Sequence, residues 1–196
     1  MPAEIVMGAL HHAWRTLLDK GVDACLMGGI ALSRWGHARF TKDVDLLISI
    51  ADDTVGELID PLKQEGFSPR RSPLINQVSQ HRFIQLMYTP KGRFDEIPLD
   101  LLIADSEFLQ GVVARSVAFQ AGETELKVVS CEDLILLKLQ ADRLIDRMDV
   151  RYLLTYNRSS LDFPYLLQWI RRFGLEAEWS SWWKDAFPDE PPPLCS

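Results

Sequence analysis

Two pairs of residues in the amino-terminal part of the chain have the types and spacing of a phosphate and metal site. Gly28 and Gly29 follow a short apolar run, and Asp43 and Asp45 come after thirteen further residues. Adjacent glycines between a strand and a helix let a ligand approach the backbone closely and leave peptide N–H groups facing outward, which suits phosphate. Aspartates at alternate positions of a strand point to one face and can chelate a hard divalent cation.

A third carboxylate is needed if two cations are to be held, and Asp100 is the best candidate. It lies in the apolar run 97–103, where alternation places Leu99, Leu101 and Ile103 on one face and Asp100 on the other. An aspartate in an apolar strand is costly unless it is paired or binds a metal. We therefore expect this strand to lie beside the strand of the aspartate pair and to help hold Mg²⁺ or Mn²⁺.

The hydrophobic periodicity predicts a mixed α/β fold around these residues. Strands 82–88 and 97–103 should form a hairpin, and Ser130 should cap a helix that has Asp133 at its third position. The segment 68–76 is expected to be a loop. Helices are expected over 3–20, 30–35, 52–64, 134–144, 150–156 and 165–173, and strands over 22–27, 44–50, 82–88, 97–103, 112–119 and 125–129.

The composition shifts from strands to helices near Ser130, which predicts two parts. Residues 1–130 would form a catalytic core, and residues 131–196 a helical carboxy-terminal subdomain. The subdomain ends in a tail rich in tryptophan and proline. This tail either packs on the helices or binds a partner.

Length and charge narrow the class of protein. A chain of 196 residues that is 47% apolar can bury a sizeable core, and a net charge of −7 argues against general coating of nucleic acid. Cys25, Cys131 and Cys195 form no CxxC pair, so neither a zinc site nor a disulfide framework is encoded. No apolar stretch is long enough to span a bilayer. We expect a cytoplasmic protein with no membrane partner.

The glycine pair and the Asp-x-Asp strand resemble the signature of the DNA polymerase β-like nucleotidyltransferase superfamily. Within it, the run 39–47, the helix with Lys138, and the spacing Arg143-x-x-Asp146-x-x-Asp149 look like the AbiEii/MenT-type group, which includes toxins of toxin–antitoxin pairs. The resemblance spans residues 22–154. It implies a mixed β-sheet nucleotidyltransferase core with flanking helices and a helical carboxy-terminal portion.

The resemblance also implies an activity. The protein would transfer a nucleoside monophosphate from an NTP to the hydroxyl of an RNA such as tRNA, a protein or a small molecule, with pyrophosphate leaving and a cognate antitoxin as partner. Gly28 and Gly29 would hold the β- and γ-phosphates, and Asp43 and Asp45 both metal ions. Asp100 would help bind the catalytic metal and accept the proton of the attacking hydroxyl.

Several residues keep two interpretations. Lys138 would contact the triphosphate, or form a surface pair with Asp142 worth about 0.3–0.5 kcal/mol. Nucleotide binding by Arg39 and Lys42 competes with plain solvent exposure. Gly29 stands where many superfamily members have a serine, and Ser33 is the candidate to replace that contact.

Further alternatives concern groups of residues and the protein as a whole. The face with Arg143, Asp146 and Asp149 is either a salt-bridge network or part of the catalytic machinery. The four arginines 70, 71, 82 and 93 form either a basic rim for an RNA end or a solvated loop. The histidines show no ligand spacing. For the whole protein, the alternatives are a catalytically silent nucleotide- or partner-binding protein and a metal-dependent glycosyltransferase.

Overall fold

The computed structural model describes residues 3–78, 80–122 and 124–193. The chain divides into two compact units. The first consists of the described residues of Met1–Ile30 and Arg39–Val129, and the second of Ala31–Ala38 with those of Ser130–Ser196. A simple division at residue 130 does not predict that Ala31–Ala38 groups with the carboxy-terminal helices.

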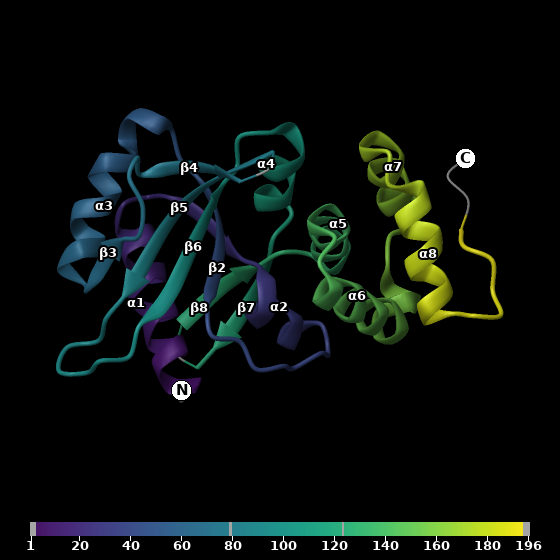
Figure 1. The fold of residues 1–196 in the computed structure, drawn as a ribbon, viewed down its shortest axis with the longest axis horizontal. Coiled ribbons are helices and arrows are strands. Elements are labelled where there is room, and N and C mark those ends of the chain that lie inside the picture. The colour runs from purple at the N-terminus through teal and green to yellow at the C-terminus, as the bar shows by residue number, and fades with distance from the viewer. Residues whose placement is uncertain (1–2, 79, 123, 194–196) are drawn as a thin grey trace. The chain divides into compact units, whose positions relative to one another are not determined.

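A mixed sheet forms the centre of the first unit (Figure 1). Its strand order is β3-β5-β6-β2-β1-β8-β7, with β4 paired to β5. The predicted hairpin is confirmed, because β5 and β6 are antiparallel neighbours. The predicted adjacency of the two aspartate strands is confirmed as well, because β2 and β6 pair in parallel. The strands are β1 Asp23–Leu26, β2 Val44–Ser49, β3 Phe67–Pro69, β4 Ile75–Val78, β5 His81–Tyr88, β6 Ile97–Ile103, β7 Val117–Ala121 and β8 Thr124–Val128.

Helices of the first unit cover the sheet. The apolar stripe of α1 (Ala3–Asp19) is buried, and α1 lies behind β6 and β2 in Figure 1, in contact with α3 (Val55–Gln64). A 3-10 turn, Asp52–Thr54, precedes α3. Strands β2 and β6 thus have an apolar face that is fully covered, and Leu46, Leu99 and Leu101 are all buried. The aspartates project from the other face of the same two strands.

Two local predictions in the first unit are wrong. The segment 112–119 is not one strand: α4 (Glu107–Ala114) ends there and β7 follows. The helix forms because the Ser106 hydroxyl accepts a hydrogen bond from Leu109 N at 3.2 Å, which caps its first turn. The predicted loop 68–76 also contributes the short edge strands β3 and β4, because both find backbone partners on β5.

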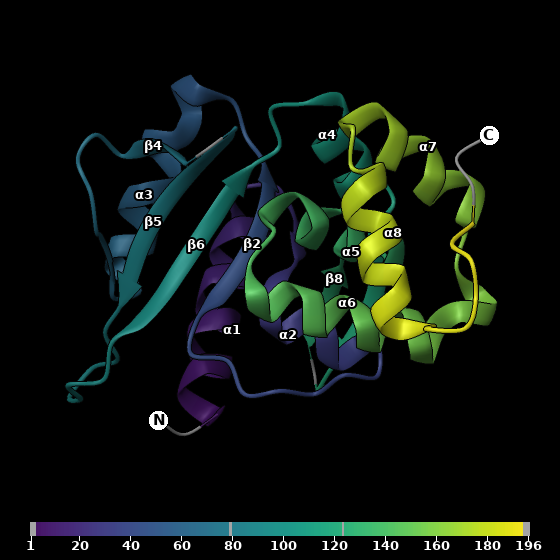
Figure 2. The same ribbon diagram turned by 45° about the vertical axis from the view of Figure 1, so that its right-hand side comes forward.

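The second unit is helical. It contains α5 (Cys131–Ala141), α6 (Leu144–Asn157), α7 (Phe163–Phe173), α8 (Glu176–Ala186) and a 3-10 turn at Arg158–Ser160. The predicted Ser130 cap is confirmed, since its hydroxyl accepts from Asp133 N at 3.1 Å. Helix α8 is not predicted by the sequence pattern, and its three tryptophans are buried as it packs on α6 and α7 (Figure 2). Packing on the helices is therefore the correct interpretation of this part of the tail.

The remaining sequence expectations concern cysteines and membrane spans. Cys25 and Cys131 are buried and form no disulfide, and burial raises the pKa of the Cys131 thiol. Cys195 lies outside the described residues. Across the described residues, no helix combines the length and the apolar character that crossing a bilayer would take.

Candidate active site

Asp45 and Asp100 are direct neighbours across the parallel pair β2–β6. The register aligns Asp45 with Asp100, between the pairs Val44–Leu99 and Leu46–Leu101. Residues in register on parallel strands point to the same face of a sheet. The structure therefore brings the second and third predicted carboxylates together on the face opposite the buried leucines.

Asp43 precedes the first residue of β2 and is held by the loop before that strand. The Thr41 hydroxyl donates a short hydrogen bond to Asp43 Oδ1. Thr41 also lies against Gly29, where an added Cβ would come within 2.8 Å of the threonine side chain. Gly29 thus contacts Thr41, and Thr41 in turn bonds Asp43. A side chain at position 29 would displace the threonine that orients Asp43, so glycine is required there.

Gly28 has an equally direct relation to Asp45. Its φ of +63° lies in the left-handed region that favours glycine, and a Cβ at this position would overlap the Asp45 carboxylate. The backbone is tied together just before it, where Met27 N donates to Asp45 O at 3.0 Å. The glycine pair occupies the first turn of α2 (Gly28–Arg34), so the expected glycine turn is part of the helix.

Gln85 of β5 and Arg70, which directly follows β3, both approach the Asp100 carboxylate. Gln85 Nε2 donates to Asp100 Oδ1 at 3.2 Å, and Arg70 Nη1 lies 3.9 Å from the same oxygen. Burial raises the pKa of Asp100, and the charge of Asp43 acts in the same direction, against the opposing effects of Gln85, Arg70 and Arg71. Asp43 is therefore close enough to Asp100 for its negative charge to disfavour the ionised form of Asp100.

This donor set fits a divalent metal chemically. Among the described residues, no three His, Cys, Asp or Glu side chains are gathered closely enough to hold a metal ion as they stand. Carboxylate oxygens are nevertheless the ligands that Mg²⁺ and Mn²⁺ prefer. Asp45 and Asp100 share a face in register, and the repulsion between Asp43 and Asp100 is what a bound cation would neutralise.

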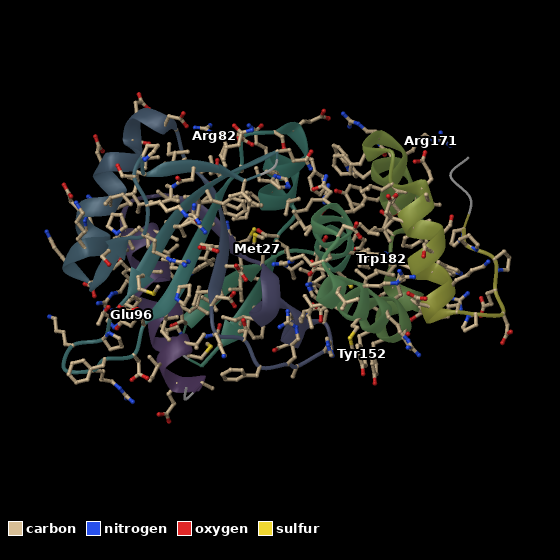
Figure 3. The ribbon with its side chains drawn as sticks, viewed as in Figure 1. Met27, Arg82, Glu96, Tyr152, Arg171 and Trp182 are labelled. Atoms are coloured by element: carbon tan, nitrogen blue, oxygen red, sulfur yellow. The ribbon has the colours of Figure 1, made fainter. Side chains whose placement is uncertain are left out.

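The four arginines of the suggested basic rim do not act together. Arg82 bonds Asp52 at 2.5 Å and lies 3.8 Å from Asp105, while Arg93 bonds Asp95 at 3.0 Å. Arg82 and Glu96, the residue before β6, lie at opposite ends of the sheet in Figure 3. Arg82 and Arg93 are thus paired with local carboxylates, and the basic rim stays a prediction. Arg70 and Arg71 are the two whose charges act on Asp100.

In the second unit, Lys138 lies at the centre of a buried ion-pair network. Its ammonium donates to Asp146 Oδ1 at 3.0 Å and to Asp149 Oδ2 at 2.7 Å, and all three side chains are at most 4% exposed. Arg143 donates to both oxygens of Asp146, at 2.6 and 3.1 Å. The surface pair of Lys138 with Asp142 is therefore wrong, and the salt-bridge interpretation of Arg143, Asp146 and Asp149 describes what the structure shows.

The network lowers the pKa of Asp146: burial would raise it, but the hydrogen bonds and charges of Arg143 and Lys138 outweigh that effect. It also reaches the segment after α2, because His37 Nε2 lies 3.4 Å from Asp149 Oδ1 and the His37 ring stacks on Tyr152 at 4.0 Å. Contact between Lys138 and the triphosphate stays a prediction. Two of the three N–H groups of its ammonium already donate to Asp146 and Asp149.

The sequence model of one family, described as "Nucleotidyl transferase AbiEii toxin, Type IV TA system", matches residues 15–181. The chain belongs to the AbiEii nucleotidyltransferase family. No curated protein sequence matches it significantly. The matched residues include the glycine pair, the three carboxylates and the ion-pair network, so both units carry parts of the family pattern.

Solved structures confirm the nucleotidyltransferase fold of this AbiEii-family protein. The antibiotic-resistance factor ANT(2'')-Ia is 16% identical, with 91% of this chain and 97% of that chain covered and a TM-score of 0.57. JHP933 from Helicobacter pylori is 17% identical over 96% and 81%, with a TM-score of 0.53. An antigenic nucleotidyltransferase-like protein from Paracoccidioides brasiliensis is 15% identical over 92% and 96%, with a TM-score of 0.51.

Nucleotide contact by Ser33, Arg39 and Lys42 stays a prediction. Ser33 is exposed in the part of α2 that belongs to the second unit, Arg39 is half-buried, and Lys42 is exposed in the segment before β2. Sequence reasoning missed Thr41 and Gln85. The sequence contains an indication of each. Thr41 carries a hydroxyl two residues before Asp43, a common arrangement for a local hydrogen bond. Gln85 is a polar residue within an apolar strand.

Proposed function

We propose that this AbiEii-family protein is a divalent-metal-dependent nucleotidyltransferase. The acceptor oxygen would form a bond to the α-phosphorus of an NTP while the bond from that phosphorus to the β-phosphate oxygen breaks, releasing pyrophosphate. The observation that carries the proposal is the in-register pair of Asp45 and Asp100 on one face of β2 and β6, with the Gly28 backbone against Asp45. Family membership supports the same class of reaction.

The proposed roles follow from position. Asp43, Asp45 and Asp100 would hold Mg²⁺ or Mn²⁺, which when bound neutralises charge on the attacking and leaving oxygens. Asp100 would also accept the proton of the attacking hydroxyl. The backbone N–H groups of Gly28 and Gly29 would bind the β- and γ-phosphates beside the carboxylates.

We further propose that the protein acts as a toxin with a cognate antitoxin. The description of the matched family names a type IV toxin–antitoxin system, and this is what supports the proposal. The acceptor is proposed only as a hydroxyl compound, which RNA, protein and small molecules all supply.

The test is transfer of label. The purified protein is incubated with each α-³²P NTP, Mg²⁺ or Mn²⁺, and separated RNA, protein and small-molecule fractions of a cell extract. We expect one fraction to be labelled and pyrophosphate to appear in equal amount. Asp43→Asn should reduce transfer at least a hundredfold, since removal of one charge from a metal site weakens both metal binding and charge neutralisation.

Asp60→Asn is the matched control, because Asp60 is an exposed aspartate of α3 paired with Lys63. It should leave transfer unchanged. Binding of NTP with no labelled fraction and no pyrophosphate would overturn the enzymatic proposal in favour of a silent nucleotide-binding protein.

A further inference from the structure

Gln85 is a polar residue of β5 whose side chain is committed to Asp100. It lies directly opposite Asp100 in the β5–β6 ladder, and its Nε2 donates the 3.2 Å bond to Asp100 Oδ1. Its neighbours Ile84 and Leu86 are buried. The other polar atom of the amide, Oε1, is buried and has no hydrogen-bond partner among the described residues.

The orphaned oxygen shows what determines the orientation of the amide. A buried acceptor without a donor is unfavourable. Rotating the amide by half a turn would leave Nε2 unpaired instead and would place Oε1 against the Asp100 oxygen, where two acceptors repel. The observed orientation is therefore selected by the negative charge of Asp100. Gln85 thus donates a hydrogen bond to Asp100, although its own Oε1 then accepts none among the described residues.

Arg70 approaches the same carboxylate oxygen from the neighbouring edge of the sheet. Its backbone N donates to Gln85 O at 2.9 Å, and its Nη1 lies 3.9 Å from Asp100 Oδ1. Two donors from adjacent segments thus converge on Oδ1. Neither of them is bonded to Oδ2.

We propose that Gln85 and Arg70 are positioning residues that hold Asp100 by Oδ1 and present Oδ2 to the divalent cation. The inference rests on the proposed function, because it assigns Asp100 a metal to bind. A carboxylate restrained through one oxygen loses less rotational freedom when the other coordinates a cation, so residues of this kind increase metal affinity without touching the metal.

The experiment measures Mn²⁺ binding to the protein without nucleotide, by the loss of the free-ion EPR signal, and the Mn²⁺ dependence of transfer. Gln85→Met keeps the length of the side chain and removes its donor. We expect about tenfold weaker Mn²⁺ binding. The Mn²⁺ concentration for half-maximal rate should rise by the same factor, and the rate should recover at saturating Mn²⁺, which a general packing defect would not produce.

Arg70→Met should weaken Mn²⁺ binding about threefold, because its contact is longer and more exposed, and Arg70→Lys should restore most of that loss. This position also provides the test if Gln85→Met folds poorly. The matched controls are Gln120→Met, in the exposed part of β7, and Arg93→Met, in the loop before β6. Both should bind Mn²⁺ as the wild type does.

The outcomes separate the two proposals. Wild-type protein that neither binds Mn²⁺ nor transfers label would overturn the proposed function. Wild-type protein that does both, with Gln85→Met and Arg70→Met binding Mn²⁺ within twofold of it, would overturn the positioning role alone.

Discussion

Replacing Lys138 by methionine tests how the helical unit is stabilised. Methionine fills a similar volume but leaves two buried carboxylates without the ammonium that lies 3.0 Å from Asp146 and 2.7 Å from Asp149. Asp146 keeps its bonds to Arg143, and Asp149 keeps its contact with His37 at 3.4 Å. Removing one partner of a buried ion pair typically costs about 3–5 kcal/mol. We expect a loss in this range.

The assay is thermal unfolding followed by tryptophan fluorescence. Five of the six tryptophans lie in the second unit, so the signal reports mainly on the helices around Lys138. For a chain of this length the expected loss corresponds to a decrease in Tm of about 6–20 °C. Lys63→Met is the matched control, because Lys63 forms an exposed pair with Asp60 and should cost less than about 1 kcal/mol.

A second variant isolates the charge. Asp149→Asn in the Lys138→Met background removes the charge of one of the two buried carboxylates that have lost the ammonium, and it should restore more than about 1 kcal/mol of the free energy of unfolding. If Lys138→Met is no more destabilised than Lys63→Met, the network contributes as little as a surface pair and this reasoning is refuted.

Three further predictions concern the glycine turn and the titrating aspartates. Gly28→Ala should abolish transfer and lower the free energy of unfolding by more than about 1 kcal/mol, because the position has a positive φ and the added Cβ would overlap Asp45. The control is Gly56→Ala, where an added Cβ would meet no atom within 4 Å; in urea unfolding it should be neutral or stabilising. Asp100→Asn should have a higher Tm than the wild type at pH 7, because folding raises the pKa of Asp100 and so disfavours its ionised form. The difference in Tm should shrink as the pH falls through the raised pKa. A difference that persists at low pH would contradict a raised pKa of Asp100. The pKa of Asp146 is lowered in the folded state, so its contribution to the free energy of unfolding should be complete above its ordinary pKa of 3.8 and disappear as the pH falls below that value. In urea titrations, the free energies of unfolding of wild type and Asp146→Asn should therefore converge only in that acid range.

Much of the site's framework is predictable from the sequence because it depends on local periodicity. Alternation places Asp45 and Leu46 on opposite faces of β2, and the same rule places Asp100 opposite Leu99 and Leu101 of β6. Ser130 caps α5 as its spacing to Asp133 predicts. These features involve residues within a few positions of one another, so they can be interpreted without the rest of the chain.

The errors have a common origin in competing local signals. The apolar residues of 112–119 suit a strand, but the cap at Ser106 begins a helix that includes the first of them. The three tryptophans of α8 give no clear start signal, and the helix forms because they are buried against α6 and α7. In both places a contact outside the segment decided between two acceptable local structures.

The sequence by itself determined which residues could do chemistry and which face of each strand they occupy. Only the tertiary structure decided that Asp45 is in register with Asp100, that Gln85 and Arg70 hold one oxygen of Asp100, and that Lys138 is buried between two aspartates. The physical reason is that register and ion pairing depend on side chains distant in the sequence, whose pairing is selected by burial and charge in the folded protein.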